Sequence, residues 1–291
     1  MKASWGSLFF VVMLSGCIDR GDAFVDAFFL VDTTPGVLPP IDANQPVGPV
    51  VVGQDLTPAD YECLGAAPIP SGDPTAVDVT LRDWVDGHVR ASVTFAAAPT
   101  GAWSLSSSCA GVLDCASATS DASGRLTARM RSGPIWMLTT DGGVTTWISG
   151  QRVPVGASTF DVPVVSIAII SRLQSVLGPF SIGTVRDCAG AAVHRSRVRA
   201  FDSSGREVEV RYASSDASLL DTDRTTIDGV FAAPNVDRGS ATRVEAWGLR
   251  EVGGVEVLLG CRVIEPTTAA AVLVDVGPLT SDAPATCGTS P

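Results

Sequence analysis

A four-residue motif occurs twice in this chain and constrains the fold more than any other feature. Thr80–Asp83 reads Thr-Leu-Arg-Asp, and Thr184–Asp187 reads Thr-Val-Arg-Asp. In both places a glycine follows shortly and an alternating stretch comes next. Further along, Gly142-Gly143-Val144 in one copy matches Gly253-Gly254-Val255 in the other. Self-similarity of this kind predicts two copies of one domain.

The segments between the turns alternate in hydrophobicity with a period of two. Val77, Val79 and Leu81 alternate with polar residues in the first copy, as do Val244 and Ala246 in the second. Glycine, aspartate and proline separate the segments, and the chain holds 29 Gly and 19 Pro. This pattern is typical of antiparallel β-sandwiches. We therefore predict an all-β chain with two Ig-like or transthyretin-like sandwiches in tandem.

The second copy resembles the carboxypeptidase regulatory-like domain, and the first is similar over a looser match. The resemblance covers about 180–276 and, loosely, about 74–165. It implies a transthyretin-like sandwich of seven strands that serves as a noncatalytic attachment. His194–Arg197 departs from the Gly-Ala pair that this family often has before its second strand. Three segments carry the resemblance: Gly183–Asp187, Val198–Gly205 and Thr226–Phe231.

The start of the chain resembles a bacterial lipoprotein signal. Lys2 precedes an apolar run, Leu8–Leu14, and Leu14–Cys17 resembles a lipobox. Cleavage before Cys17 and acylation of that residue would anchor the protein to a membrane. Because Ile18 rather than Asp follows, the sorting pattern favours the outer membrane. The alternatives are a secreted protein cut at another small residue and an uncleaved start with a chance cysteine.

These features divide the chain into five segments. The stretch before the first sandwich is rich in proline and aspartate, which is typical of an extended tether. Within it, Ala23–Asp32 is apolar enough to lie against the membrane or the folded domains, or to bind a partner. The predicted segments are a signal peptide (1–16), the acylated cysteine and tether (17–62), the first sandwich (63–165), an inter-domain segment with a helix at Ser166–Leu177 (166–179), and the second sandwich with a tail (180–291).

Six cysteines follow Cys17, and three disulfides are expected in an oxidising compartment. Cys109 and Cys115 bracket a short loop, and Cys188 and Cys261 bracket the second domain, which leaves Cys63 with Cys287. A zinc site is the alternative, but the spacing contains no CxxC pair. We therefore expect a disulfide set rather than a metal site.

Charge and motifs exclude several classes of function. The net charge of -11 argues against nucleic acid as a partner. His88 and His194 fall in different domains, so neither is expected to act in catalysis or bind a metal. The carboxylates Asp216, Asp221, Asp223 and Asp228 lack the ligand order of an EF-hand, which leaves calcium as a weak alternative there. We predict no catalytic residue, cofactor or metal.

Two tryptophans form a candidate site for a glycan. Trp84 and Trp103 lie in turn-like stretches and are candidates for stacking on a sugar ring. Trp136 and Trp247 stand at matching places in the two copies, so we expect them in the core. The sequence thus predicts a membrane-anchored, noncatalytic binding or structural module of the cell envelope, whose partner is an envelope protein or a glycan. Carbohydrate or cell-wall binding is the alternative, and an enzyme with an unrecognised site is a remote one.

Overall fold

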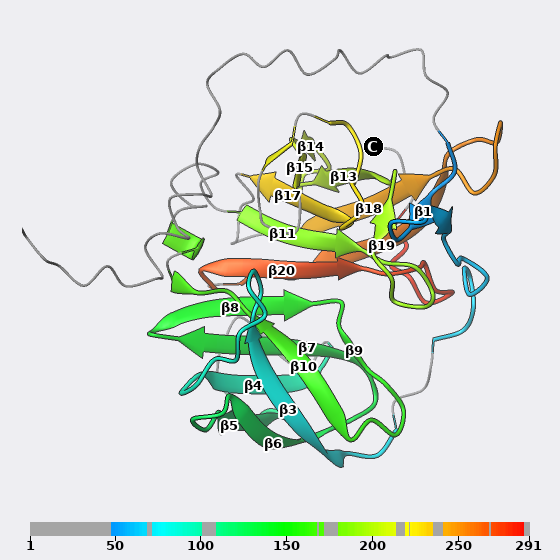
Figure 1. Ribbon diagram of the computed structural model, residues 1–291. Coiled ribbons are helices and arrows are strands. Elements are labelled where there is room, and N and C mark those ends of the chain that lie inside the picture. Colours follow the sequence, from blue (N-terminus) through cyan, green and yellow to red (C-terminus); the bar gives the residue numbers. More distant parts are fainter. Residues whose placement is uncertain are drawn as a thin grey trace, which may run out of the picture. The chain divides into compact units, whose positions relative to one another are not determined.

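Strands make up nearly all of the regular structure in the part of the chain that the structure describes (Figure 1). The computed structural model describes residues 48–68, 72–100, 109–167, 169–171, 180–213, 219–220, 222–234, 241–267 and 269–287. The all-β class predicted from the alternating segments is confirmed.

The first copy of the repeat supplies the strands from β3 to β10. Alternation is clear in β6, whose residues are exposed and buried in turn, as expected for a strand that covers a core with one face. The strands are β3 (Thr75–Asp83), β4 (Thr94–Pro99), β5 (Ala116–Thr119), β6 (Arg125–Met130), β7 (Gly133–Asp141), β8 (Val144–Ser149), β9 (Arg152–Val153) and β10 (Thr159–Val164).

The second copy repeats this order with short additions. β11 is buried at every position, which indicates a strand that is covered on both faces. The strands are β11 (Phe180–Val185), β12 (Val193–His194), β13 (Arg197–Phe201), β14 (Glu207–Val208), β15 (Arg211–Ala213), β16 (Leu219–Leu220), β17 (Val230–Pro234), β18 (Thr242–Gly248), β19 (Val257–Ile264) and β20 (Ala271–Val276).

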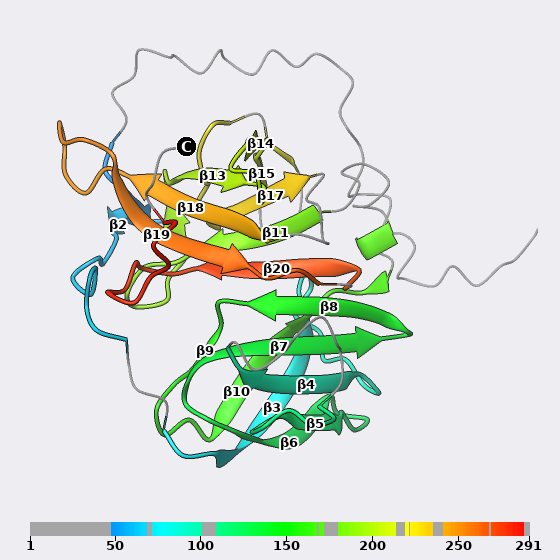
Figure 2. The ribbon, with the colours of Figure 1, turned by 180° about the vertical axis from the view of Figure 1, so that it is seen from behind.

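A ten-stranded central sheet contains strands of both copies (Figure 2). Its path runs β16-β15-β17-β11-β20-β8-β7-β4-β5, and β9 pairs with β7. The two copies meet where β8 and β20 pair in parallel, from Thr146 opposite Ala271 to Ser149 opposite Val274. The sheet β10-β3-β6 and the sheet β14-β13-β18-β19 complete the two sandwiches.

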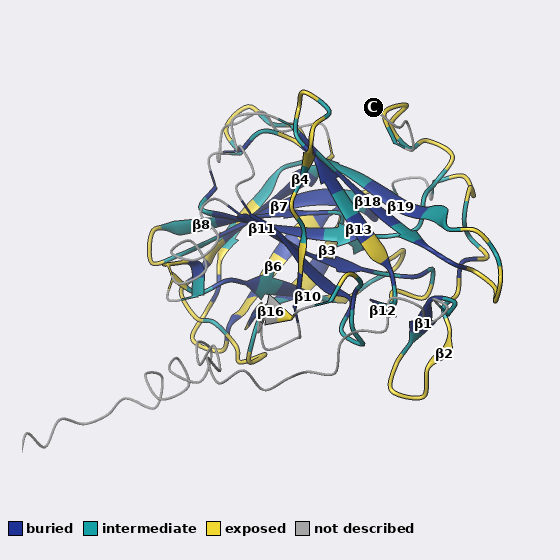
Figure 3. Ribbon diagram, turned by 90° about the horizontal axis from the view of Figure 1, so that it is seen from above, coloured by how far each residue is buried: buried dark blue, intermediate teal, exposed yellow. Residues whose placement is uncertain are grey.

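Each face of the central sheet carries its own hydrophobic core. Consecutive residues of β4 alternate between the cores, because Phe95 and Ala97 belong to one and Ala96 and Ala98 to the other. Both cores mix residues of the two copies. Most of the buried residues lie in strands, whereas the exposed ones lie mainly in the turns (Figure 3). The two sandwiches therefore share packing as well as hydrogen bonds.

The two copies of the repeated motif make the same hydrogen bonds. Asp83 N donates to His88 O at 2.7 Å, and Asp187 N donates to Ala191 O at 3.0 Å. The amide of the residue after the Thr in each motif bonds to a glycine carbonyl, which is Gly124 in the first copy. The motif is thus the start of the same turn in each sandwich.

Residues 48–62, which the sequence analysis assigned to the tether, are part of the folded body. β1 (Val51–Val52) pairs with β2 (Thr57–Pro58) and with β12 of the second copy. Val50 donates its amide hydrogen to Leu249 O at 2.8 Å, and its side chain lies in a core. Within 48–62, Pro58 lies in β2 and Asp55 in the turn before it. Residues 17–47 of the predicted tether, with the apolar stretch Ala23–Asp32, lie outside the described residues.

The predicted helix at Ser166–Leu177 falls partly within the described chain. Residues 167 and 169–171 are helical, and Ile170 N donates to Ser166 O at 3.0 Å. Residues 172–177 lie outside the described residues. Across the part of the chain that the structure describes, no helix has the length and apolar character needed to cross a membrane.

Candidate functional site

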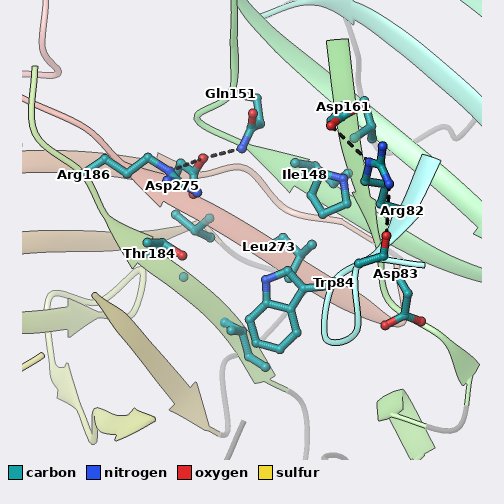
Figure 4. A pocket seen from close by; sticks show the side chains of 16 residues that line it. Arg82, Asp83, Trp84, Ile148, Gln151, Asp161, Thr184, Arg186, Leu273 and Asp275 are labelled. Atoms are coloured by element: carbon teal, nitrogen blue, oxygen red, sulfur yellow. Dashed lines mark hydrogen bonds and ion pairs between the residues drawn. The ribbon is translucent and has the colours of Figure 1, made fainter. Parts of the chain in front are cut away.

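The candidate site is a cleft of about 290 Å³ between the two copies (Figure 4). Its first wall comes from the end of β3, the following turn and β10, and its second from β11 and β20. The loop after β8 lies beside Asp275. Apolar side chains contribute to the lining together with charged ones: Trp84, Ile148, Val162, Ile182 and Leu273 on the apolar side, and Arg82, Asp161, Arg186, Asp275 and Gln151 on the polar side.

An arginine–aspartate pair from the first copy lies at the cleft. Arg82 is the arginine of the repeated motif, and its Nε donates to Asp161 Oδ2 at 3.1 Å. One of its terminal nitrogens donates to Gly87 O at 3.2 Å, which holds the guanidinium against the turn. Gly87 has φ of 69°, a conformation that favours glycine. Both side chains are exposed to solvent.

The matching pair of the second copy lies deeper. Arg186 Nε lies 3.0 Å from Asp275 Oδ2, and another nitrogen donates to Gly190 O at 3.1 Å. Gln151 of the first copy donates its amide to the same carboxylate oxygen of Asp275. Burial raises the pKa of Asp275, although Arg186 and Gln151 act against this effect. The junction between the copies thus encloses Asp275, whereas its counterpart in the first copy, Asp161, is exposed.

Trp84 is placed at the cleft by the turn that begins with Asp83. The Trp84 amide donates to Val164 O at 2.8 Å, and the Asp83 carboxylate accepts from Val85 N at 2.9 Å. Asp83 is buried, which raises its pKa. The half-buried indole of Trp84 packs on the core, and the close view shows it among the lining residues. The turn and its carboxylate therefore fix the position of the ring.

This arrangement suits a neutral ligand that has both an apolar face and hydroxyl groups. An indole and aliphatic side chains offer contact to the apolar face of a sugar ring. A hydroxyl can donate to a carboxylate and accept from a guanidinium, which the two pairs present together. An anion would have to compete with Asp161 and Asp275 for their arginines. The chemistry of the cleft therefore favours an uncharged polyol over a charged ligand.

The tryptophans predicted from the sequence fall in different environments. Trp84 lies at the cleft, and Trp103 falls within 101–108, outside the described residues. Trp136 is buried as expected and lies opposite Ala98 of β4. Trp247 lies opposite Arg197 and is half-buried, with Nε1 donating to Glu245 Oε2 at 2.9 Å. The core prediction is therefore confirmed for Trp136 and wrong for Trp247. Val244 and Ala246 of β18 point into the core, so the next residue, Trp247, points to the other face of the strand.

The six cysteines form three disulfides, but two of the pairings differ from those expected. Cys109–Cys115 is confirmed. Cys63 bonds to Cys188, and Cys261 bonds to Cys287. The expected Cys188–Cys261 and Cys63–Cys287 pairs were wrong because residues 48–66 fold onto the second sandwich, where Asp60 O accepts from Cys188 N at 2.8 Å. That contact brings Cys63 to Cys188.

The two histidines lie in different environments. His88 is exposed in a turn, 3.2 Å from Asp86, and His194 lies in β12, where burial lowers its pKa. Asp216 and Asp221 lie outside the described residues, so calcium binding at that cluster stays an alternative prediction. Among the described residues no group of three or more potential metal ligands is found.

Sequence reasoning missed the residues that complete the cleft. Asp161, Asp275 and Gln151 were not singled out, although the arginine of each repeated motif is the partner of one of the two aspartates. A signal was present, because an aspartate follows the motif at the matching place in both copies. Alignment of the last strand of each copy would have found it.

Comparisons with known proteins identify no family. No protein-family model matches the chain, and no curated protein does. Among solved structures, the shaft pilin SpaA from Lactobacillus rhamnosus GG matches with 11% identity and a TM-score of 0.23, over 71% of this chain and 98% of that chain. A streptococcal ancillary pilin matches with 10% identity and a TM-score of 0.24, over 71% of this chain and 69% of that chain.

Proposed function

We propose that this protein is a noncatalytic binding or structural module of the cell envelope, anchored by acylation of Cys17. The anchor places it at a membrane, for which the outer membrane is our preferred site. Its two sandwiches, which resemble carboxypeptidase regulatory-like domains, are joined by the shared sheet. Cys17 itself lies outside the described residues.

The disulfide set is the observation that carries this proposal. All six cysteines in the described part of the chain are paired. Stable disulfides are typical of exported proteins and are rare where thiols are kept reduced. An oxidising compartment agrees with a lipoprotein signal at the start of the chain.

Intact mass of the protein from a membrane fraction tests the proposal. We expect a chain that begins at acylated Cys17 and gains two hydrogens per disulfide on reduction. The Cys17→Ser variant should lose the acyl mass and leave the membrane fraction while keeping its disulfides. An unacylated wild-type chain, or one with free thiols, would contradict the proposal.

Carbohydrate binding is a second candidate function, favoured by the position of Trp84. The ring lies at a cleft that combines apolar contacts with two arginine–aspartate pairs. Such a combination matches the two faces of a neutral sugar. The binding module would then recognise a glycan of the envelope.

Titration with neutral oligosaccharides tests this second candidate. Maltotetraose, cellotetraose and chitotetraose are suitable probes, with binding followed by calorimetry. Trp84→Ala should abolish binding and lower the Tm, because the indole also packs on the core. Trp84→Phe should weaken binding with a smaller change in Tm. Trp247→Phe is the matched control because it also removes an indole, but away from the cleft. Binding that is equal in Trp84→Ala and wild type would exclude this site.

A further inference from the structure

The two copies correspond strand by strand, and the correspondence identifies two matching sheet edges. In the first copy β10 is parallel to β3, which is antiparallel to β6. In the second copy β20 is parallel to β11, which is antiparallel to β17. Likewise β4-β7-β8 corresponds to β13-β18-β19. Thus β10 is the counterpart of β20, and β8 is the counterpart of β19.

The junction inside the molecule is therefore of the head-to-tail kind. The edge of β8 pairs with the edge of β20, so each copy contributes a different edge. This junction leaves the two counterpart edges unused. They are β10, an end strand of its sheet, and β19, an end strand of the four-stranded sheet. Repetition of such a junction between molecules would give an open filament.

The β10 edge keeps a stretch of backbone available for pairing. The carbonyls of Ser158 and Val164 accept hydrogen bonds from β3 or the residue after it. Because backbone groups alternate in direction along a strand, those of Thr159 and Asp161 face the open edge. Asp161 of β10 matches Asp275 of β20. Counted from this match, Ala157–Phe160 corresponds to Ala271–Val274, the part of β20 that pairs with β8. Pro163 lies beyond this stretch and does not interrupt it.

The β19 edge is covered by the segment that follows β20. Leu279 N donates to Leu259 O at 2.8 Å, and Gly260 forms a bridge with Pro278. Cys261, on the same edge, bonds to Cys287. Gly65 N donates to Leu279 O at 2.8 Å, and this bond ties the segment to the start of the folded body. We call residues 277–287 the edge segment.

We propose that the edge segment is a cap and that the β19 edge beneath it is an interface for β10 of a second copy of this chain. The observation that points to a second copy is the β8–β20 junction, which already joins the matching edges. Release of the cap would expose the β19 edge, with one unpaired row of backbone groups. Molecules would then add head to tail. The inference does not rest on the proposed function.

Light scattering after size exclusion tests the proposal with the full chain. All samples carry Cys17→Ser, so that no acyl chain causes association. The variant Cys261→Ala/Cys287→Ala/Leu279→Pro loses the disulfide and the bond to Leu259, and we expect a mass that rises at least twofold with concentration. Cys109→Ala/Cys115→Ala, which loses a disulfide elsewhere, should stay monomeric. The chain that carries Cys17→Ser alone should also be a monomer.

A mixing experiment distinguishes pairing of β10 with β19 from nonspecific association. A capped molecule still offers its β10 edge, so an excess of it should bind the exposed β19 edge and end the growth of filaments. Excess capped protein should therefore reduce the mean mass toward that of a dimer. Thr159→Pro in the capped protein should remove this effect. A variant that stays monomeric although limited proteolysis cuts its edge segment would overturn the proposal, as would filaments whose mass is unchanged by excess capped protein.

Discussion

At the scale of single residues, the two arginine–aspartate pairs show how the junction between the copies changes the solvent exposure of a repeated ion pair. The same pair occurs in each copy, yet the side chain of Asp161 is 63% exposed and that of Asp275 is 15% exposed. The difference arises because the first copy covers Asp275 with Gln151 and its loop. Burial therefore disfavours the charged form of Asp275, whereas the exposed Asp161 carboxylate stays in contact with water.

Asp275→Asn should become more stable relative to wild type as the pH rises. Burial raises the pKa of Asp275 in the folded chain above that in the unfolded chain. Between those two values the folded chain binds more protons, so stability falls as pH increases. Asparagine has no such proton. We expect the Tm difference, variant minus wild type, to increase from about pH 4 to about pH 7.

Thermal unfolding across that pH range measures the difference. Asp161→Asn is the matched control, because it breaks the corresponding pair where the carboxylate is exposed. An equal slope against pH in both variants would show that burial at the junction is not the cause.

Gly150→Ala should destabilise the protein strongly. Gly150 has φ of 90°, and an added Cβ would collide with the backbone oxygen of Asp275 across the junction. Gly156 also has a positive φ, 73°, but an added Cβ there meets nothing within 4 Å. We expect Gly156→Ala to cost about 1 kcal/mol and Gly150→Ala about 3 kcal/mol or more. Denaturant unfolding measures both costs, and equal values would contradict the close approach.

At the scale of elements, the sequence predicted strands well and their partners poorly. Alternation of Val77, Val79 and Leu81 was enough to place β3, and the repeated motif predicted matching turns. The pairing of β8 with β20 had no local signal, because a parallel pair joins segments far apart in the chain. The sequence indicates the shared sheet only indirectly. β4 and β7 are apolar on both faces, because each face packs against a core.

The cleft shows the same limit. Trp84 was singled out because an indole in a turn is conspicuous, and it lies at the cleft. Asp275 could not be recognised from composition, because aspartates are common in this chain and its partner Gln151 comes from the other copy. The pairings predicted for the other four cysteines failed for a similar reason, because spacing identified Cys109–Cys115 but carries no information on how 48–66 folds back.

Removal of Cys63–Cys188 should cost more stability than removal of Cys109–Cys115. The first bond closes a sequence separation of 125 residues and the second one of 6. Loop-closure entropy predicts losses of about 5 kcal/mol and about 2 kcal/mol, respectively, for the paired Cys→Ala variants. Denaturant unfolding of both double variants measures the losses. A larger loss for Cys109→Ala/Cys115→Ala would show that entropy of the unfolded chain does not set the order.

At the scale of the whole molecule, the shared sheet predicts one cooperative unfolding transition. Phe180 and Leu273 of the second copy pack in the core with Phe95, and Trp136 and Leu138 of the first pack in the other core. Neither sandwich can therefore unfold without exposing apolar surface of its neighbour. Calorimetry should give a calorimetric enthalpy equal to the van't Hoff enthalpy. Two separate transitions would show that the copies are independent.

The Cys63–Cys188 bond also determines how the molecule carries a pulling force. Tension applied between a point before Cys63 and a point beyond Cys287 crosses from Cys63 to Cys188 and from Cys261 to Cys287 through sulfur. Residues 64–187, which include every strand of the first sandwich, lie outside that path. The backbone that bears the load is 188–261. A molecule tethered at its start would thus stretch its second sandwich while the first remains mechanically slack.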